Sequence, residues 1–197
     1  LVGSEMCIRD RPSCHPSLDC GTAMESKSIL ERFKLLPGIN VPVKTTMAMR
    51  LDYGPFTHLG RTVQLPAIEG ETYPALVSDI DDNFNEIAGI RLPDIEVPLA
   101  TSTGWNLRHD SIGNPELYIG ITGGLAGWTK PFASTKVLRQ SIGDPRLSIE
   151  ERYQSREHYV SLVENSAILL VDKRYMLEED VKRMSESAGL KFDFFTN

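Results

Sequence analysis

The spacing of apolar residues changes along the chain and predicts different elements in different parts. Between residues 46 and 100, short apolar or alternating runs are separated by turn residues, a pattern typical of strands. Several strands are expected at sheet edges, because prolines in this region each remove a ladder donor. The turn of the clearest hairpin is predicted at Asp81 to Asn85. The predicted strands are Thr46 to Leu51, Arg61 to Leu65, Tyr73 to Ile80, Ile87 to Leu92 and Ile95 to Leu99.

The last fifty residues follow a helical period instead. Ser148 and Glu151 have the spacing of a capping box, which predicts a helix start, and Ser155 is placed to cap the next helix. A final helix is predicted from Glu178 to Ala188, because acidic residues at its start suit the helix dipole and Gly189 is a common stop. The apolar stripe of the helix that follows Ser155 is made of Tyr159, Val163, Ala167 and Leu170.

Two further segments precede these helices. Residues 12–45 are rich in Pro, Ser and Gly and carry one short helical pattern, with capping-box spacing at Ser28 and Glu31 and a stop at Pro37-Gly38. The apolar face of this helix is Ile29, Leu30, Phe33 and Leu36. Residues 101–147 are predicted to be a long glycine-rich loop, and a loop of that length is expected to be functional or packed against another part of the protein.

These elements predict an α+β fold, with short, mostly antiparallel strands at about 46–100, the glycine-rich loop, and C-terminal helices. We divide the chain into residues 1–11, a connector at 12–45, a strand and loop region at 46–147, and a helical region at 148–197. Residues 1–11 resemble the sequencing-adapter read-through found at the ends of reading frames in metagenomic assemblies. The native sequence is therefore expected to begin near Pro12.

Composition excludes several classes of protein. The chain has 197 residues, of which 41% are apolar and 24% charged, and this argues against collagen, coiled coils and wholesale disorder. The formal net charge is -6 and the charges are interspersed, so nucleic-acid binding is not expected. No apolar run approaches the roughly 18 residues that a membrane span requires, so the chain is expected to be soluble. No cofactor is expected.

A serine motif is the first candidate for chemistry. Ala100 to Gly104 resembles the G-x-S-x-G nucleophile elbow with its first glycine replaced, and Ser102 stands at the nucleophile position. The elbow needs a tight turn between a strand and a helix, and the helix start helps to complete the oxyanion hole. No helical pattern follows Gly104, so Ser102 is predicted to be structural.

Metal and phosphate motifs are incomplete. The start of a calcium loop is imitated by Asp79, Asp81, Asn83 and Asn85, but Phe84 and Ile90 stand where that loop needs Gly and Glu. The glycines between 120 and 127 match neither a dinucleotide-binding motif nor a P-loop. Cys14 and Cys20 are open to two interpretations, a disulfide or two free thiols, and a metal site there would need further ligands. No metal site is predicted.

The histidines give no strong catalytic candidate. His109 and Asp110 are adjacent, and adjacent residues rarely face each other as a base and its orienting acid must. His158 lies beside the apolar stripe and is expected at the boundary of the core. The other two histidines, His15 and His58, are predicted to lie in loops.

The substrate-binding candidates are Trp105, Asn106 and Arg108. They combine a planar aromatic ring, an amide and a fixed cation in a loop, where binding residues are often found. Such a loop can bind a carboxylate or a sugar-like group. The alternative is structural, with Trp105 as a buried plug and Arg108 as its salt-bridged neighbour.

Several long segments resemble the bacterial family of alpha/beta hydrolase domain-containing proteins. The main segment is Glu86 to Arg108, and shorter ones are Leu125 to Ala133, Gly143 to Tyr153, Leu177 to Asp180, Arg11 to Pro16 and Leu36 to Ile39. The resemblance covers essentially everything after residue 11. It implies an esterase-like serine hydrolase in which the hydrolase core, with its nucleophile, acid and histidine, precedes the region matched here.

The resemblance also limits what this chain is expected to do. It implies a non-catalytic C-terminal extension whose partner is the preceding hydrolase core, and whose small-molecule ester substrate is hydrolysed elsewhere. Family members often have an aromatic residue at position 102, which weakens Ser102 further. The alternative from the residues alone is a small autonomous ligand-binding or interaction module without catalysis.

Overall fold

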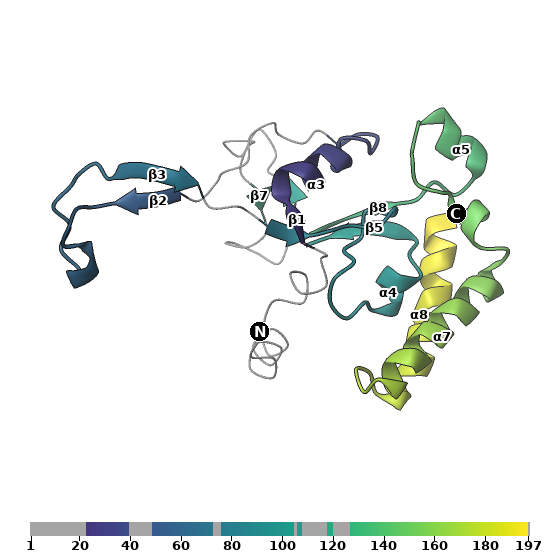
Figure 1. The fold of residues 1–197 in the computed structure, drawn as a ribbon. Helices are drawn as coiled ribbons and strands as arrows, with labels where there is room; N and C mark the ends of the chain where they lie inside the picture. Colours follow the sequence, from purple (N-terminus) through teal and green to yellow (C-terminus); the bar gives the residue numbers. More distant parts are fainter. Residues whose placement is uncertain are drawn as a thin grey trace.

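The computed structural model describes residues 23–39, 49–72, 76–104, 106–107, 118–119 and 127–196. Helices and short strands are mixed in it, and every described ladder is a two-stranded antiparallel sheet, which confirms the predicted α+β class (Figure 1). The pairs are β1 (Ala23–Glu25) with β4 (Leu76–Ser78), β2 (Met49–Asp52) with β3 (Ile68–Thr72), β5 (Ala100–Thr103) with β8 (Trp128–Pro131), and β6 (Asn106–Leu107) with β7 (Tyr118–Ile119).

Helix α3 (Ser26–Phe33) confirms the predicted apolar face. Its apolar residues Ile29, Leu30 and Phe33 are buried, as is Leu36 just beyond its end. The ring of Phe33 lies 5.5 Å from that of Phe84 and 6.3 Å from that of Trp128. The capping box predicted at Ser28 is wrong, because α3 already begins at Ser26, directly after β1. Ser28 therefore lies inside the helix.

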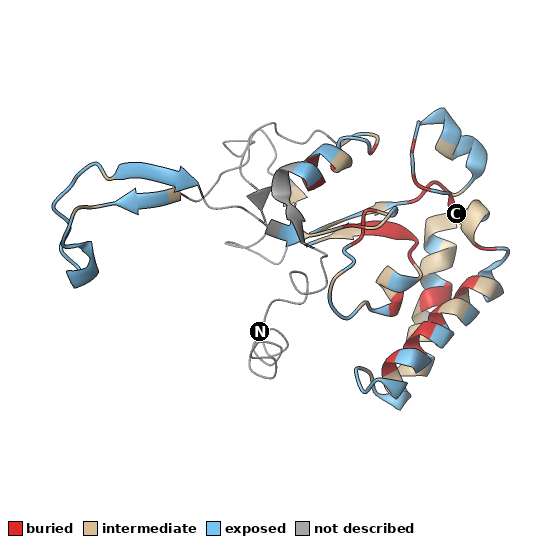
Figure 2. Ribbon diagram, viewed as in Figure 1, coloured by how far each residue is buried: buried red, intermediate tan, exposed pale blue. Residues whose placement is uncertain are grey.

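Residues 49–72 form an extended hairpin, here called the arm. It consists of β2, the 3-10 helix η1 (Thr57–Leu59) and β3, and it projects away from the rest of the chain (Figure 1). None of its residues is buried (Figure 2). The strand predicted at Arg61 to Leu65 is wrong. The backbone N–H groups of Val63 and Gln64 donate to the Tyr53 carbonyl, and the second strand starts only at Ile68, after Pro66.

The turn at Asp81 to Asn85 is confirmed, but the strands expected after it are not. An isolated bridge between Ile80 and Glu86 closes the turn, and Phe84 has a φ of 62° in it. The stretches Ile87 to Leu92 and Ile95 to Leu99 form no strand, and helix α4 (Pro93–Glu96) lies there instead. Proline favours the first helical position because its fixed φ suits a helix and its missing N–H is not needed there.

The prediction that residues 101–147 lack regular structure is also wrong. This part contains β5 from Thr101 on, β8, and helix α5 (Lys136–Ser141), which Thr135 caps by accepting a hydrogen bond from the Leu138 N–H. Gly127 allows β8 to approach β5 closely, since a Cβ there would overlap the Thr103 carbonyl oxygen. The glycine-rich sequence predicted a loop, whereas Gly127 allows the close approach on which this strand pair depends.

The C-terminal helices follow the predicted pattern closely. They are α6 (Ile149–Arg152), α7 (Arg156–Asp172) and α8 (Glu178–Thr196). The capping box at Ser148 and the cap at Ser155 are present, and all four stripe residues of α7 are buried. No helix among the described residues is long and apolar enough to cross a bilayer.

Helix α8 differs from its prediction because it continues seven residues beyond Gly189. Gly189 is buried, and a Cβ there would overlap the guanidinium of Arg156 on α7. Arg156 in turn donates to Asp193, 2.8 Å away on α8. The glycine therefore serves helix packing rather than helix termination.

Candidate functional site

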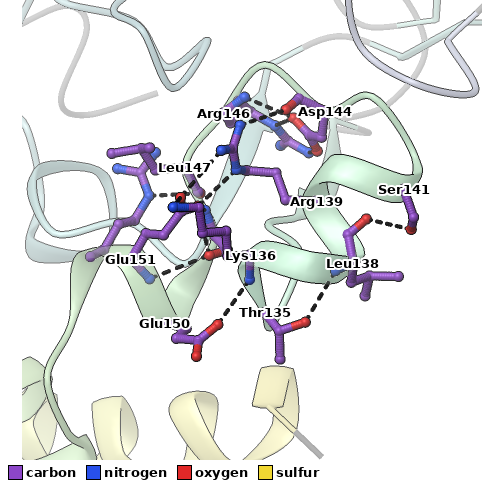
Figure 3. Close-up of polar contacts among 12 residues, drawn as sticks. Thr135, Lys136, Leu138, Arg139, Ser141, Asp144, Arg146, Leu147, Glu150 and Glu151 are labelled. Carbon is purple, nitrogen blue, oxygen red and sulfur yellow. Dashed lines mark hydrogen bonds and ion pairs between the residues drawn. The ribbon is translucent and has the colours of Figure 1, made fainter.

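A fully buried ion pair organises the region between the β5–β8 sheet and the C-terminal helices. Arg146 lies with Asp144 on the segment between α5 and α6, and their side chains are 0% and 2% exposed (Figure 3). Two guanidinium nitrogens of Arg146 donate to Asp144, at 3.0 and 2.6 Å. Burial alone would raise the pKa of Asp144, but hydrogen bonds from the Arg146 side chain and backbone hold that pKa below its ordinary value.

The same arginine fixes the position of both strands of the sheet. Its terminal nitrogens donate to the carbonyl oxygens of Lys130 and Pro131 on β8, at 3.0 and 3.1 Å, and to the Thr101 hydroxyl on β5, at 2.8 Å. The Thr101 hydroxyl then donates to the Asn83 carbonyl. A buried charge is tolerated when all its donors are satisfied, and this one is satisfied by atoms from three segments.

Asn85 completes the other edge of β5. Its side chain is fully buried, donates to the Ala100 carbonyl at 3.1 Å, and accepts from the Ser102 N–H at 2.8 Å. A side-chain amide thus replaces a neighbouring strand at this edge. Asp81 holds the turn in place by accepting from the N–H groups of Asn83 and Asn85 and from Arg91.

The two carboxylates of the calcium-like pattern, Asp79 and Asp81, form hydrogen bonds within the protein. The Asp79 carboxylate accepts from Arg32 and from the Ile80 N–H, and the Asp81 carboxylate is occupied by the turn and by Arg91. Among the described residues, no three side chains of the metal-ligating types lie together as a metal site would require. The polar residues of this turn therefore have structural roles.

A cleft of about 450 Å³, here called the α8 cleft, lies between the sheet and the last helix. Hydroxyl groups of Ser102, Thr129 and Ser187 line it, together with apolar residues of α8. An ion pair of 2.6 Å between Lys191 and Asp94 ties α8 to α4 beside it. Burial, and next the charge of Asp94, raise the pKa of Tyr159, which also lines the cleft.

Ser102 has no catalytic setting in this cleft. It is the third residue of β5, within an extended strand paired at Thr129, and not on a turn between a strand and a helix. Neither described histidine lines the cleft: His58 is in η1, and His158 on α7 accepts from the Gln154 N–H. Among the described residues that line the cleft, no histidine is present to serve as the base that activates a serine nucleophile.

The three substrate-binding candidates are only partly visible. Asn106 opens β6, where it pairs with Ile119 three residues beyond the end of β5. Trp105 and Arg108 lie outside the described residues, as do Cys14, Cys20 and His109. Of the three candidates, the structure therefore describes only Asn106, at the start of a short strand pair.

Residues 37–186 match the family described as "Alpha/beta hydrolase domain". The chain belongs to this family. No curated protein and no solved structure shows a significant match to it.

Membership of the alpha/beta hydrolase domain family changes how the polar core is interpreted. The ion pair of Asp144 and Arg146 and the sheet that it holds all lie within the matched region. The buried amide of Asn85 also lies within the matched region. So do Ser102 and Thr129, which line the α8 cleft. The described residues of this family member form a hydrogen-bonded framework beside the α8 cleft.

Asp144 and Arg146 were not singled out from the sequence as framework residues, and Asn85 was noted there only in a predicted turn and an incomplete calcium pattern. The sequence Gly143-Asp144-Pro145-Arg146 is a local signal for a tight turn. That this turn is buried follows only from its contacts with β5 and β8, which are far away in the sequence. Sequence spacing alone carries no information about those contacts.

Proposed function

We propose that this chain is the non-catalytic part of an esterase-like serine hydrolase. The nucleophile, the acid and the histidine are supplied by a hydrolase core that precedes it. In this proposal the serine of the core attacks the ester carbonyl and the alcohol leaves. Water then hydrolyses the acyl-enzyme to release the acid. The observation that carries the proposal is family membership over residues 37–186 without a nucleophile–base pair among the described residues.

The sheet pattern supports this division of roles. In an alpha/beta hydrolase the nucleophile elbow stands at the end of a strand in the central sheet, where it turns into a helix. Each ladder in the described part of this chain is antiparallel, two-stranded and at most five residues long. Such sheets suit an accessory region better than a catalytic core.

Exposed apolar residues support a docking role. The arm exposes large apolar side chains without burying any, with Leu65 at 75% and Leu59 at 64%. Helix α5 exposes Val137 at 76% in the same way. A two-stranded hairpin is marginally stable by itself, so packing of the arm on the core gives it a partner.

We propose that Trp105, Asn106 and Arg108 bind the substrate in the assembled enzyme. Asn106 opens β6, three residues beyond β5, whose position the buried framework fixes. Substitution of Asn106 or Arg108 by Ala is expected to raise KM more than it lowers kcat, because these side chains bind the substrate and take no part in bond breaking.

The test compares this chain with a longer protein that includes the preceding reading frame. Hydrolysis of p-nitrophenyl butyrate is expected from the longer protein only, and substitution of the serine of an upstream G-x-S-x-G by Ala should abolish it. Ser102→Ala and the exposed-surface control Ser141→Ala should leave it unchanged. Turnover by the chain alone that disappears with Ser102→Ala would overturn the proposal.

The second candidate is an autonomous binding module, and one observation favours it. Helices α7 and α8 share one buried apolar core with Leu99, Phe132 and Ile149, in which Val163 is fully buried. A cooperative thermal melt of the isolated chain, without binding of an apolar dye, would favour the module. A melt without cooperativity, with strong dye binding, would favour the accessory region of a larger enzyme.

A further inference from the structure

A second cleft, of about 500 Å³, lies between α4 and the helices α6 and α7, and is here called the Arg152 cleft. Its volume is within the range of small-molecule sites. Apolar walls come from Val97 and Pro98 after α4 and from Leu162 and Leu169 on α7. Arg152, the last residue of α6, is the one cation that lines it.

The guanidinium of Arg152 is held rigidly. Its Nε donates to the Leu147 carbonyl at 3.0 Å, and its central carbon lies 4.3 Å from the ring centroid of the buried Phe132. A guanidinium has five N–H donors. The four on its terminal nitrogens make no hydrogen bond to any residue that the structure describes. Two fixed, parallel donors are the geometry that binds a carboxylate with both oxygens.

Arg152 also lacks a charge partner, unlike its neighbours. Arg146 pairs with Asp144, Arg139 with Glu151, and Arg91 with Asp81. In the described part of the chain no carboxylate lies within ion-pair distance of Arg152. Arg152 is half-buried, and this burial lowers the pKa of its guanidinium.

The remaining polar groups leave the cleft suited to an anion. Its only carboxylate, Glu96, lies 3.2 Å from the guanidinium of Arg91, so its charge is balanced outside the cleft. The hydroxyl of Tyr153 donates to the Pro98 carbonyl and is not available. Amides of Asn83 and Asn165 line the opening and can donate to a ligand oxygen.

We propose that the Arg152 cleft binds a small organic carboxylate with an apolar body. The carboxylate pairs with the terminal nitrogens of Arg152, and the apolar body lies against Pro98, Leu162 and Leu169. An anion here compensates a cation that has no ion-pair partner among the described residues, and the apolar walls select against small inorganic anions. The site lies entirely within described residues and does not depend on an upstream catalytic core.

Calorimetric titration of the whole chain with sodium benzoate tests the site. We expect a dissociation constant on the order of 1 mM, since a ligand of this size has few atoms with which to bind. The uncharged isostere benzamide and inorganic phosphate are each expected to bind at least about tenfold more weakly. Equal binding of benzamide or of phosphate would overturn the assignment, as would the absence of benzoate binding.

Matched variants locate the binding. Arg152→Lys keeps the charge but loses the paired donors, and is expected to weaken benzoate binding about tenfold. The control Arg61→Gln removes an exposed arginine that also stacks on an aromatic ring, 5.4 Å from Phe56, and should have no effect. Unchanged affinity of Arg152→Lys would overturn the proposal.

A second pair of variants avoids any loss of folding at Arg152. Leu169 is 57% exposed and lines the cleft, whereas its neighbour Ile168, 43% exposed, does not line it. Leu169→Glu should abolish benzoate binding by placing a carboxylate at the site, while Ile168→Glu should bind as the parent does. Circular dichroism of each sample verifies that the total helix content is unchanged. Loss of benzoate binding in both variants, or in neither, with helices intact, would overturn the assignment of this cleft.

Discussion

The arm and the helical body (residues 93–104 and 127–196) are stabilised in opposite ways. In the helical body, hydrogen bonds join distant parts of the chain: the Tyr153 hydroxyl bonds the Pro98 carbonyl, and Lys191 pairs with Asp94. In the arm, side-chain hydrogen bonds join residues two or three positions apart, such as Asp52 with Gly54 and Thr57 with Gly54. The helical body has a buried centre and the arm has none (Figure 2).

This difference shows where the stability of the chain lies. Burial of apolar area is the main favourable term in folding, and buried polar groups add specificity only where they are paired. The helical body satisfies both conditions. The arm satisfies neither by itself, so substitutions should separate the two regions by their effect on the free energy of unfolding.

The largest effect is expected at the buried ion pair. Arg146→Ala leaves Asp144 buried without its partner and breaks the bonds to β5 and β8, so we expect a loss of about 3–5 kcal/mol in unfolding free energy. Urea denaturation followed by circular dichroism measures it. Arg61→Ala in the arm removes the same side chain from an exposed site and should cost less than about 0.5 kcal/mol. Equal costs would contradict the distinction between the regions.

The contrast between local and long-range contacts also explains which features could be predicted from the sequence. The α7 stripe and the caps at Ser148 and Ser155 were predictable, because they depend on residues within one or two helical turns. The family resemblance located the matched region in the same way, from contiguous motifs. By contrast, the roles of Asn85 and Arg146 depend on strand register and on contacts across 15 residues or more.

The structural roles of two glycines were predicted wrongly from the sequence, for a physical reason. A glycine can end a helix, but at Gly189 it admits the Arg156 side chain between two helices, and at Gly127 it brings two strands together. Both uses depend on what lies opposite the missing side chain. The sequence of the glycine's own segment contains no record of that neighbour.

The next effect is expected at the amide that completes the edge of β5. Asn85→Ala leaves the Ala100 carbonyl and the Ser102 N–H without a partner, and we expect a loss of about 2–4 kcal/mol. Asn83→Ala is the matched control, because it lies in the same turn and contributes its backbone carbonyl, which the substitution keeps. A cost for Asn83→Ala as large as that for Asn85→Ala would show that the turn itself, and not the amide, is responsible.

A smaller effect is expected from one hydroxyl between distant segments. Tyr153→Phe removes the hydrogen bond to the Pro98 carbonyl but keeps the ring that packs 4.9 Å from that of Tyr159. We expect a loss of about 1 kcal/mol in thermal or urea unfolding. Tyr53→Phe in the arm should leave stability unchanged. A stability loss for Tyr53→Phe as large as that for Tyr153→Phe would indicate that the arm also contributes to the fold.

Acid should weaken the helical body through Glu151. The Ser148 N–H, followed by the Ser148 hydroxyl and Arg139, lowers the pKa of Glu151 from 4.5 to about 2. Figure 3 shows Arg139 beside Glu151. A carboxyl with a lowered pKa in the folded state contributes stability above pH 4.5, and this contribution is lost as pH falls towards 2. Urea midpoints at pH 6 and pH 3 should therefore differ less for Glu151→Gln than for the parent. An unchanged difference would mean that other carboxyls dominate.

The smallest change in unfolding free energy is expected in the arm. Its size should depend on whether the arm is exposed or packed on a hydrolase core. Leu65 is 75% exposed, so Leu65→Ser should change the unfolding free energy of the chain by less than about 0.5 kcal/mol. If the arm docks on a preceding hydrolase core, the same substitution in the longer protein removes buried apolar area and should cost about 1–2 kcal/mol. Thr62→Ser, an exposed polar change in the same hairpin, should cost nothing in either protein. A Leu65→Ser cost that stays near zero in the longer protein would show that the arm remains exposed there, and the docking surface would then have to be sought on α5, where Val137 is equally exposed.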